Sequence, residues 1–205
     1  MKIDWRPGNM LYPLPAVLVS CANREGEKNL LTVAWTGTLC SDPALCYVSI
    51  RPTRKSYQYI KDTGEFVINL TNERLSKATD WCGVRSGRDY DKWKEMGLTP
   101  SGSHKLLYAP IVEESPLSIE CRVKQVIPLG THDLFIGEVV NVQVDETFID
   151  AATGAFDEKK ASLLVYEHGK YYKTGEFVGK FGWSVERKKQ KKQTLNKVKL
   201  NKENQ

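Results

Sequence analysis

Residues 51–56 combine three cations, Arg51, Arg54 and Lys55, with the hydroxyl groups of Thr53 and Ser56. An apolar run precedes this segment and a short predicted helix follows it, so the segment leads into the first turn of that helix. N–H groups in the first turn of a helix lack backbone partners and favour negative charge. The segment therefore predicts an anion site that suits a terminal phosphate. The alternative is a solvated charged turn in which Thr53 or Ser56 only caps the helix.

A second candidate segment, residues 29–38, runs from an apolar stretch into Thr36, Gly37 and Thr38. Small and hydroxyl-bearing residues let backbone donors approach a flat heteroaromatic ring closely. Trp35 could form a wall of such a site, or it could simply fill the core. The segment is therefore a candidate to lie beside a flat ligand, although a tryptophan that fills the core is the more common outcome.

The residues around both segments predict short strands. Alternating apolar residues over 117–124 leave Ser118, Glu120, Arg122 and Lys124 on a solvent-facing side. A turn at 129–133 joins this strand to a long one in an antiparallel hairpin. Apolar runs bounded by turn residues predict the other strands. The predicted strands are residues 14–22, 30–35, 44–50, 65–70, 117–124 and 134–144. Residues 161–166 and 171–174, with 168–170 between them, suggest a last strand and turn.

Short helices are predicted between the strands. Asn72 is a candidate N-cap for a helix over residues 72–81, which the glycine-containing segment 82–87 should end. Two other helices are predicted over residues 56–61 and 89–96, and residues 98–110 read as a loop. Six or seven strands with few βαβ units predict a mainly β protein, an antiparallel barrel with short helical insertions.

Charge is distributed unevenly along the 205 residues. The net charge is +5, but residues 187–205 hold eight basic residues and one acidic residue, which gives 8 − 1 = +7. The other residues hold 22 basic and 24 acidic side chains, a net charge of −2. We therefore predict a folded domain over residues 1–186 and a basic, flexible tail over 187–205. A solvated tail is favoured over a nucleic-acid site.

Lys2, Asp4 and Arg6 stand where a secretion signal needs an apolar stretch, and no run of about 18 uncharged apolar residues occurs. We therefore expect a cytoplasmic protein without a membrane segment. Five cysteines are an odd number and predict reduced thiols. No pair has the C-x-x-C spacing, and the three histidines are isolated, so no metal site is expected. Cys82 has no adjacent resolving cysteine and is interpreted as a small apolar residue.

Several short motifs occur in order between about residues 13 and 144. They are Asn29-x-x-Thr32-x-x-Trp35-Thr36, Ser41-Asp42-Pro43, Ser49-Ile50-Arg51-Pro52-x-x-x-Ser56-Tyr57, Gly64-Glu65-Phe66-Val67-Ile68-Asn69, Asp80-x-Cys82-Gly83-x-x-Ser86-Gly87, Asp91-Lys92-Trp93 and Gly130-x-His132-x-x-Phe135-Ile136-Gly137-Glu138-Val139. This ordered set resembles the flavin reductase-like family, FMN-binding split barrels that include flavoredoxin and the reductase components of two-component monooxygenases. The resemblance implies an antiparallel Greek-key split β-barrel and a homodimer with FMN near the subunit interface.

The resemblance also implies roles for individual residues. Arg51, Lys55 and Ser56 would hold the FMN phosphate, while Ser86, Gly87 and Lys92 would close the site. The residues that would surround the isoalloxazine are Asn29, Thr32, Ala34, Trp35 and Thr36. His132 resembles the histidine of the family's Gly-x-His motif and would help to place an electron donor. The ordinary alternative is a turn histidine that hydrogen-bonds to its backbone.

The implied function is an FMN-dependent oxidoreductase. It would pass electrons from NADH, NADPH or a reduced carrier through FMN to free flavin or to a partner protein. Two alternatives stay open. One is a non-enzymatic FMN-binding electron carrier. The other is a barrel that binds nucleic acid or another acidic partner through the tail at residues 187–205, in which case binding should collapse with salt.

Overall fold

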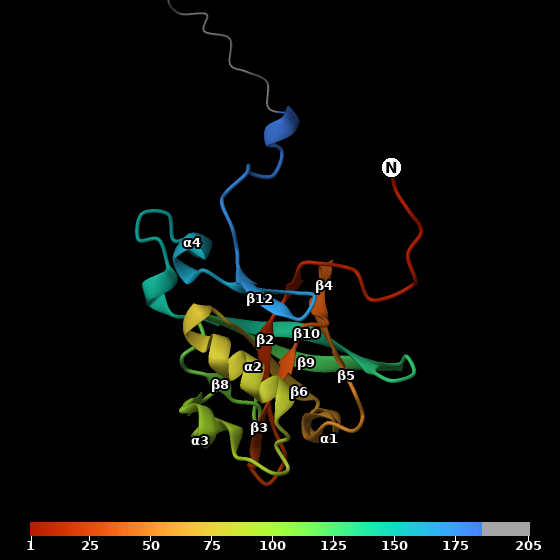
Figure 1. The fold of residues 1–205 in the computed structure, drawn as a ribbon. Helices are drawn as coiled ribbons and strands as arrows, with labels where there is room; N and C mark the ends of the chain where they lie inside the picture. The colour runs from red at the N-terminus through yellow and green to blue at the C-terminus, as the bar shows by residue number, and fades with distance from the viewer. Residues whose placement is uncertain (186–205) are drawn as a thin grey trace, which may run out of the picture. The chain divides into compact units, whose positions relative to one another are not determined.

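The computed structural model describes residues 1–185, and the predicted tail at 187–205 lies outside the described residues. Residues 1–174 form one compact unit (Figure 1). Residues 175–185 belong to a second unit, in which Trp183–Val185 form a short 3-10 helix. Within residues 1–185, no helix has both the length and the apolar character needed to cross a membrane.

Seven strands make one antiparallel sheet in the order β3-β2-β6-β9-β10-β5-β4. Their bounds are β2 Val17–Ala22, β3 Lys28–Val33, β4 Thr36–Ser41, β5 Ala44–Ile50, β6 Glu65–Leu70, β9 Leu117–Pro128 and β10 Asp133–Val144. The outer strands β3 and β4 are joined by only two residues, Ala34 and Trp35, and Ser49 N on β5 donates to Trp35 O at 2.9 Å. The two edges of the sheet must therefore come together, which curls it into a barrel.

Smaller elements surround this sheet. A three-stranded sheet contains β1 Leu14–Pro15, β11 Leu164–Glu167 and β12 Lys170–Lys173, and a two-stranded one contains β7 Pro100–Ser101 and β8 Ile111–Val112. The helices are α1 Lys55–Thr63, α2 Ser76–Val84, α3 Lys92–Met96 and α4 Glu158–Ala161, with 3-10 turns at Glu73–Leu75 and Glu146–Phe148. The predicted mainly β architecture with short helical insertions is confirmed.

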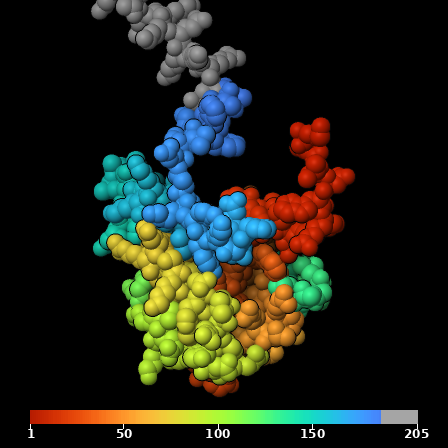
Figure 2. Space-filling model, in the orientation of Figure 1, coloured from red at the N-terminus to blue at the C-terminus, as the bar shows by residue number. Residues whose placement is uncertain are grey.

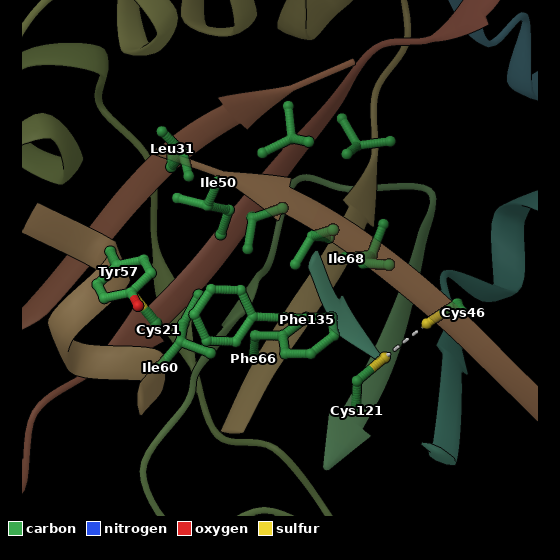
Figure 3. Close-up of a cluster of buried hydrophobic side chains, with 14 residues drawn as sticks. Cys21, Leu31, Cys46, Ile50, Tyr57, Ile60, Phe66, Ile68, Cys121 and Phe135 are labelled. Atoms are coloured by element: carbon green, nitrogen blue, oxygen red, sulfur yellow. Dashed lines mark hydrogen bonds between the residues drawn. The ribbon is translucent and has the colours of Figure 1, made fainter. Parts of the chain in front are cut away.

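The inward face of the barrel holds the main core (Figure 3). Phe66 and Phe135 are fully buried there, and the thiols of Cys46 and Cys121 lie 3.3 Å apart, sulfur to sulfur. Gly137 on β10 makes room for this packing. A Cβ atom on Gly137 would lie 2.6 Å from Phe66 Cζ and 3.1 Å from Cys121 Cβ. The glycine is therefore required by the close approach of an aromatic ring.

A second core lies on the opposite face of β2 and β3. Leu18 and Leu30 pack there against Cys82 of α2 and Trp93 of α3. β2 is consequently buried along its whole length. Figure 2 shows the yellow and light green segments of α2 and α3 covering the barrel on this face. These helices carry the residues that flank the candidate site.

The predicted end of the helix at residue 81 is wrong. Asn72 caps the preceding 3-10 turn, accepting from Arg74 N, but α2 then runs on to Val84. Gly83 lies inside this helix, at a position where a Cβ atom would stand only 3.2 Å from Thr32 Cβ. The glycine therefore serves close packing of α2 on β3 rather than ending the helix. In the next helix, the Asp91 side chain accepts from Trp93 N and Lys94 N, so α3 begins at Lys92 instead of residue 89.

The predicted solvent-facing side of β9 is only half right. Arg122 and Lys124 are exposed, but Ser118 and Glu120 are fully buried. Glu120 accepts hydrogen bonds from His104 N and Lys105 N in the loop after β7, and Ser118 Oγ donates to Asn69 Oδ1 of β6 at 2.8 Å. The loop needs these acceptors because its own backbone N–H groups have no strand partner.

Two predicted strands also need correction. The predicted strand at 30–35 ends at Val33 as β3, and the separate strand β4 begins at Thr36, where the threonine and glycine content concealed it. The predicted strand at 161–166 begins only at Leu164, because residues 158–161 form α4. The turn at His168 and Gly169 is confirmed, with both residues at positive φ.

Candidate functional site

The site is built around the junction of β5 and α1. Arg54 stands at the N-cap of α1 with extended backbone, and no side chain within residues 1–185 caps the helix. Neither Thr53 nor Ser56 therefore acts as the cap that the alternative interpretation required. Tyr57 N already donates to Arg54 O at 3.1 Å, so an anion at this nine-residue helix would be met by the N–H groups of Lys55 and Ser56.

A cavity of about 460 Å³, here called the basic cavity, opens beside this junction. Six lining residues are cationic: Arg51, Arg54, Lys55, Arg85, Arg88 and Lys92. The other lining residues are Asn29, Leu31, Thr53, Ser56, Ser86 and Gly87. No acidic residue among those described lines the basic cavity. Such a donor set suits a phosphate group.

Hydrogen bonds hold three separate segments together at this cavity. Asn29 Nδ2 donates to Ser56 Oγ at 2.7 Å, and Lys55 Nζ donates to Gly87 O at 2.8 Å and to the carboxylate of Glu27. Gly87 lies so close that a Cβ on it would stand 2.1 Å from Asn29 Oδ1. The backbone of Gly87, the amide of Asn29 and the start of α1 therefore form one connected wall.

Lys92 is a buried cation in the same wall. Its side chain is 3% exposed, and Nζ donates to Cys82 O at 2.6 Å. Burial lowers the pKa of Lys92 to about 8, and the charges of Arg54 and Lys55 act in the same direction. An anion in the cavity would favour the charged form of this lysine.

A second cavity of about 310 Å³, here called the Trp35 cavity, adjoins the first. Leu31, Arg51 and Arg54 line both cavities. The Trp35 cavity is otherwise lined by Thr32, Val33, Ala34, Trp35, Ser49, Ile50, His132 and Tyr166. Its aromatic and aliphatic walls suit a flat ring, in contrast to the charged wall of the basic cavity.

His132 closes one side of the Trp35 cavity. Its ring lies against that of Trp35, with centroids 4.5 Å apart and planes at 65°, and its Nδ1 lies 2.9 Å from Thr131 Oγ1. Burial and the nearby charges of Arg51 and Arg54 lower the pKa of His132 below its ordinary value. This shift favours the neutral form of the imidazole. Its observed partners are side chains rather than its own backbone.

The hairpin that carries His132 is tied to α1. Tyr57 Oη donates to the carboxylate of the adjacent residue, Asp133, at 2.6 Å in a buried position. The helix that begins at Lys55 and Ser56 therefore also fixes the hairpin turn. One element thus positions both ends of the candidate site.

The structure brings together ten of the eleven predicted cofactor-binding residues along the two cavities. The exception is Thr36, which lines neither cavity among residues 1–185 and whose hydroxyl donates to Tyr47 O at 2.5 Å. Thr32 lines the Trp35 cavity, but its hydroxyl donates to Thr79 O of α2.

Several lining residues were absent from the predicted set. Arg54 belonged to the predicted anion segment at 51–56, although the resemblance gave it no role of its own. Arg85 and Arg88 flank Ser86 and Gly87, and this flanking of a predicted glycine turn could have indicated them. Tyr166 comes from β11, far along the chain, and nothing in its local sequence points to the site.

Within residues 1–185, no group of three or more His, Cys, Asp or Glu side chains could hold a metal ion. The described site therefore consists of cations, amides, hydroxyls and rings around two joined cavities.

Comparison with known proteins agrees with this arrangement. A family model described as the flavin reductase like domain matches residues 9–175. Flavoredoxin of Desulfovibrio vulgaris (Miyazaki F) has a similar structure, with a TM-score of 0.84 and 31% identity over 91% of this chain and 100% of that one. Flavoredoxin from Methanosarcina acetivorans gives a TM-score of 0.80 and 28% identity with the same coverage.

A curated relative, an NADH-dependent FMN reductase of Streptomyces nodosus subsp. asukaensis, is 28% identical over 174 residues, which cover 83% of each chain. The match to the family model spans most of the chain and includes all seven strands of the main sheet. The predicted split-barrel fold is thereby confirmed. The chain belongs to the flavin reductase-like family and has the fold of flavin-related oxidoreductases.

Proposed function

We propose that this protein binds FMN across the basic cavity and the Trp35 cavity and uses it as an oxidoreductase. The observation that carries the proposal is that the two cavities share Leu31, Arg51 and Arg54 yet differ in character at their far ends. One end offers charge and hydrogen-bond donors, and the other offers flat apolar walls. FMN has the matching asymmetry, a phosphate at one end and a planar ring system at the other.

The residues present fit the phosphate end. Lys55, Ser56 and Arg51 would hold the phosphate, with Arg88 and Lys92 adding positive charge. Gly87 supports this fit because its missing side chain leaves the Asn29 amide close to the cavity wall. Charge-assisted hydrogen bonds of this kind are stronger than those between neutral groups.

The residues of the Trp35 cavity would hold the ring. Ala34 and Trp35 would wall it and exclude water, while Arg51 and Arg54 place positive charge beside it. When bound, the isoalloxazine supplies the electron-transfer chemistry. Positive charge fixed beside a flavin stabilises its reduced, more negative form.

We further propose that NADH, NADPH or a reduced carrier supplies electrons, and that free flavin or a partner protein receives them. A third cavity of about 610 Å³ shares Trp35, Ser49, Arg51 and His132 with the Trp35 cavity, so a donor could enter beside His132. The similarity to an NADH-dependent FMN reductase favours a nicotinamide donor. The similarity to flavoredoxins keeps a non-enzymatic electron carrier as the second candidate. A homodimer in the cytoplasm stays a prediction from the sequence.

The phosphate assignment is tested by replacing Lys55 and Ser56 with alanine together. We expect the double variant to bind FMN about 100-fold more weakly, since it loses a charged and a neutral hydrogen bond. Riboflavin, which lacks the phosphate, should bind almost unchanged. Lys61→Ala at the other end of α1 is the matched control and should leave both ligands unaffected. Equal losses for FMN and riboflavin would contradict the assignment.

The electron donor is tested by anaerobic stopped-flow reduction of the FMN-loaded protein with NADH, NADPH and a reduced protein carrier. Rapid bleaching of the flavin absorbance by a nicotinamide would support the reductase. If neither nicotinamide reduces the flavin while the protein carrier does, the electron-carrier function is the better description.

A further inference from the structure

Residues 175–185, here called the C-terminal segment, carry a dense set of exposed apolar side chains. Two backbone hydrogen bonds give the segment a local turn, from Trp183 N to Lys180 O and from Val185 N to Gly182 O, each 3.1 Å long. The apolar side chains are 57–107% exposed and belong to Phe177, Val178, Phe181, Trp183 and Val185. Single apolar residues are normal on a protein surface, but five within nine residues indicate a surface that another molecule covers.

A strongly positive sequence follows the C-terminal segment directly. Residues 187–205, the basic tail, carry a net charge of +7, whereas residues 1–186 carry a net charge of −2. The C-terminal segment itself is neutral, because Glu176 and Lys180 are its charged residues. The exposed apolar side chains therefore precede a block of positive charge in the chain. A partner that covers both must offer an apolar region beside dense negative charge.

We propose that the C-terminal segment and the basic tail together bind the surface of an anionic phospholipid bilayer. Aromatic side chains insert at the boundary between the headgroups and the acyl chains, and lysines near the surface are attracted to anionic headgroups. One such signal alone gives marginal, reversible binding, whereas two signals together hold a protein at a membrane. The proposal concerns a peripheral contact and does not depend on the flavin site.

Two other partners fit these observations less well. Nucleic acid would neutralise the lysines and could stack on the aromatic rings, but the aliphatic side chains of Val178 and Val185 offer no ring for a base to stack on. A second copy of this chain would offer a domain with a net charge of only −2, and the six cations that line its basic cavity would repel the tail. An anionic bilayer combines an apolar layer and dense negative charge in one surface.

The test measures sedimentation of the full chain with phosphatidylcholine vesicles that contain or lack phosphatidylglycerol. We expect binding to the anionic vesicles, and a loss of about tenfold or more in Phe177→Ser with Phe181→Ser. Replacing the four lysines within residues 188–192 by glutamine should weaken binding to a similar extent and reduce its salt dependence. Val84→Ser with Leu107→Ser, at side chains that are 72% and 78% exposed, is the matched control and should leave binding unchanged. Circular dichroism shows whether each variant is folded.

Four results would overturn the proposal. The full chain could fail to sediment with anionic vesicles, or Phe177→Ser with Phe181→Ser could bind them as tightly as the wild type. Binding to single-stranded DNA at protein concentrations where vesicles are not bound would assign the basic tail to nucleic acid. Analytical ultracentrifugation could instead show that the phenylalanine variant dissociates a dimer, which would assign the C-terminal segment to a second copy of the chain.

Discussion

Gly87 shows how a single backbone position shapes the candidate site. The close approach to Asn29, with a Cβ placed 2.1 Å from Oδ1, leaves no room for any side chain at this position. The Asn29 amide in turn donates to Ser56 at the start of α1. A change at Gly87 therefore acts on the phosphate end of the site through two neighbours.

We predict that Gly87→Ala weakens FMN binding by about tenfold or more, because the added methyl group displaces Asn29 and breaks its 2.7 Å bond to Ser56. Fluorescence titration of the flavin-free protein with FMN measures the change. Gly102→Ala is the matched control, since a Cβ there meets nothing within 4 Å. Equal effects of the two substitutions would contradict this account of Gly87.

We predict that Lys92 makes the proposed FMN binding depend on pH. Its pKa in the flavin-free protein is about 8, so the charge that would attract the phosphate is lost as the pH rises through that value. A phosphate monoester is already fully charged above about pH 7. We therefore expect FMN affinity to fall between pH 7 and 9, by at most about tenfold per pH unit.

Two controls separate this effect from other titrations. Riboflavin should show a flat profile over the same range because it lacks the phosphate. Lys92→Gln should bind FMN more weakly at pH 7 and should also show a flat profile. An unchanged pH dependence in Lys92→Gln would mean that another group is responsible.

At the scale of elements, buried carboxylates attach a long loop to the barrel. Glu120 on β9 accepts from His104 N at 3.0 Å and Lys105 N at 2.7 Å, and from Asn141 and Gln143 of β10 at 2.8 Å each. Glu65 on β6 accepts from the backbone N–H groups of residues 107–109 in the same way. The loop after β7 is therefore held by acceptors on two neighbouring strands.

We predict that Glu120→Gln lowers the free energy of unfolding by about 2–4 kcal/mol at pH 7, because an amide leaves some of these buried donors unpaired. Burial alone would raise the pKa of Glu120, but the hydrogen bonds it accepts lower it below the ordinary value. The stabilisation is therefore complete above about pH 4.3 and is lost as the pH falls through the lower folded-state pKa.

Urea denaturation at several pH values between 7 and 3 measures this difference. The gap between wild type and Glu120→Gln should shrink below about pH 4. Glu138→Gln on β10 removes a carboxylate from an exposed pair with Lys124 and should cost less than about 1 kcal/mol. A gap that stays constant down to pH 3 would contradict the role assigned to Glu120.

Elements with strong local signals were predicted from the sequence. The hairpin of β9 and β10 was evident because its apolar residues alternate and Gly130 marks its turn. The end of α2 was missed because Gly83 can be read as a helix breaker, whereas the structure uses it for packing on Thr32. Burial of Glu120 was missed because its partners come from a loop that no local pattern connects to β9.

At the scale of the whole molecule, charge is split between the domain and the tail. Deletion of residues 187–205 would remove a charge of +7 and leave a net charge of −2. The cavities of the proposed flavin site are lined by residues 8–166. We therefore predict that the truncated protein binds FMN with unchanged affinity and is reduced at an unchanged rate.

Flavin titration and stopped-flow reduction of the truncated protein check this prediction. If a negatively charged partner depends on the tail, its binding should instead disappear in the truncated protein and weaken with salt in the full chain. Loss of FMN binding on truncation would show that the tail contributes to the flavin site.

The candidate site was predictable where its residues belong to recognisable local motifs. The segments around Arg51 and Trp35 were identified in this way, and the structure brings both to the joined cavities. Tyr166 could not be predicted, because only the pairing of β11 with β1 brings it near the barrel.

The two arginines that line both the basic cavity and the Trp35 cavity limit how this protein can diverge. A mutation at Arg51 or Arg54 alters the surroundings of both ends of a ligand at once. New ligand preferences should therefore arise first at positions that line one cavity alone, such as Ser56 or Ala34. Among relatives with different ligands, these positions should vary while the shared arginines stay the same.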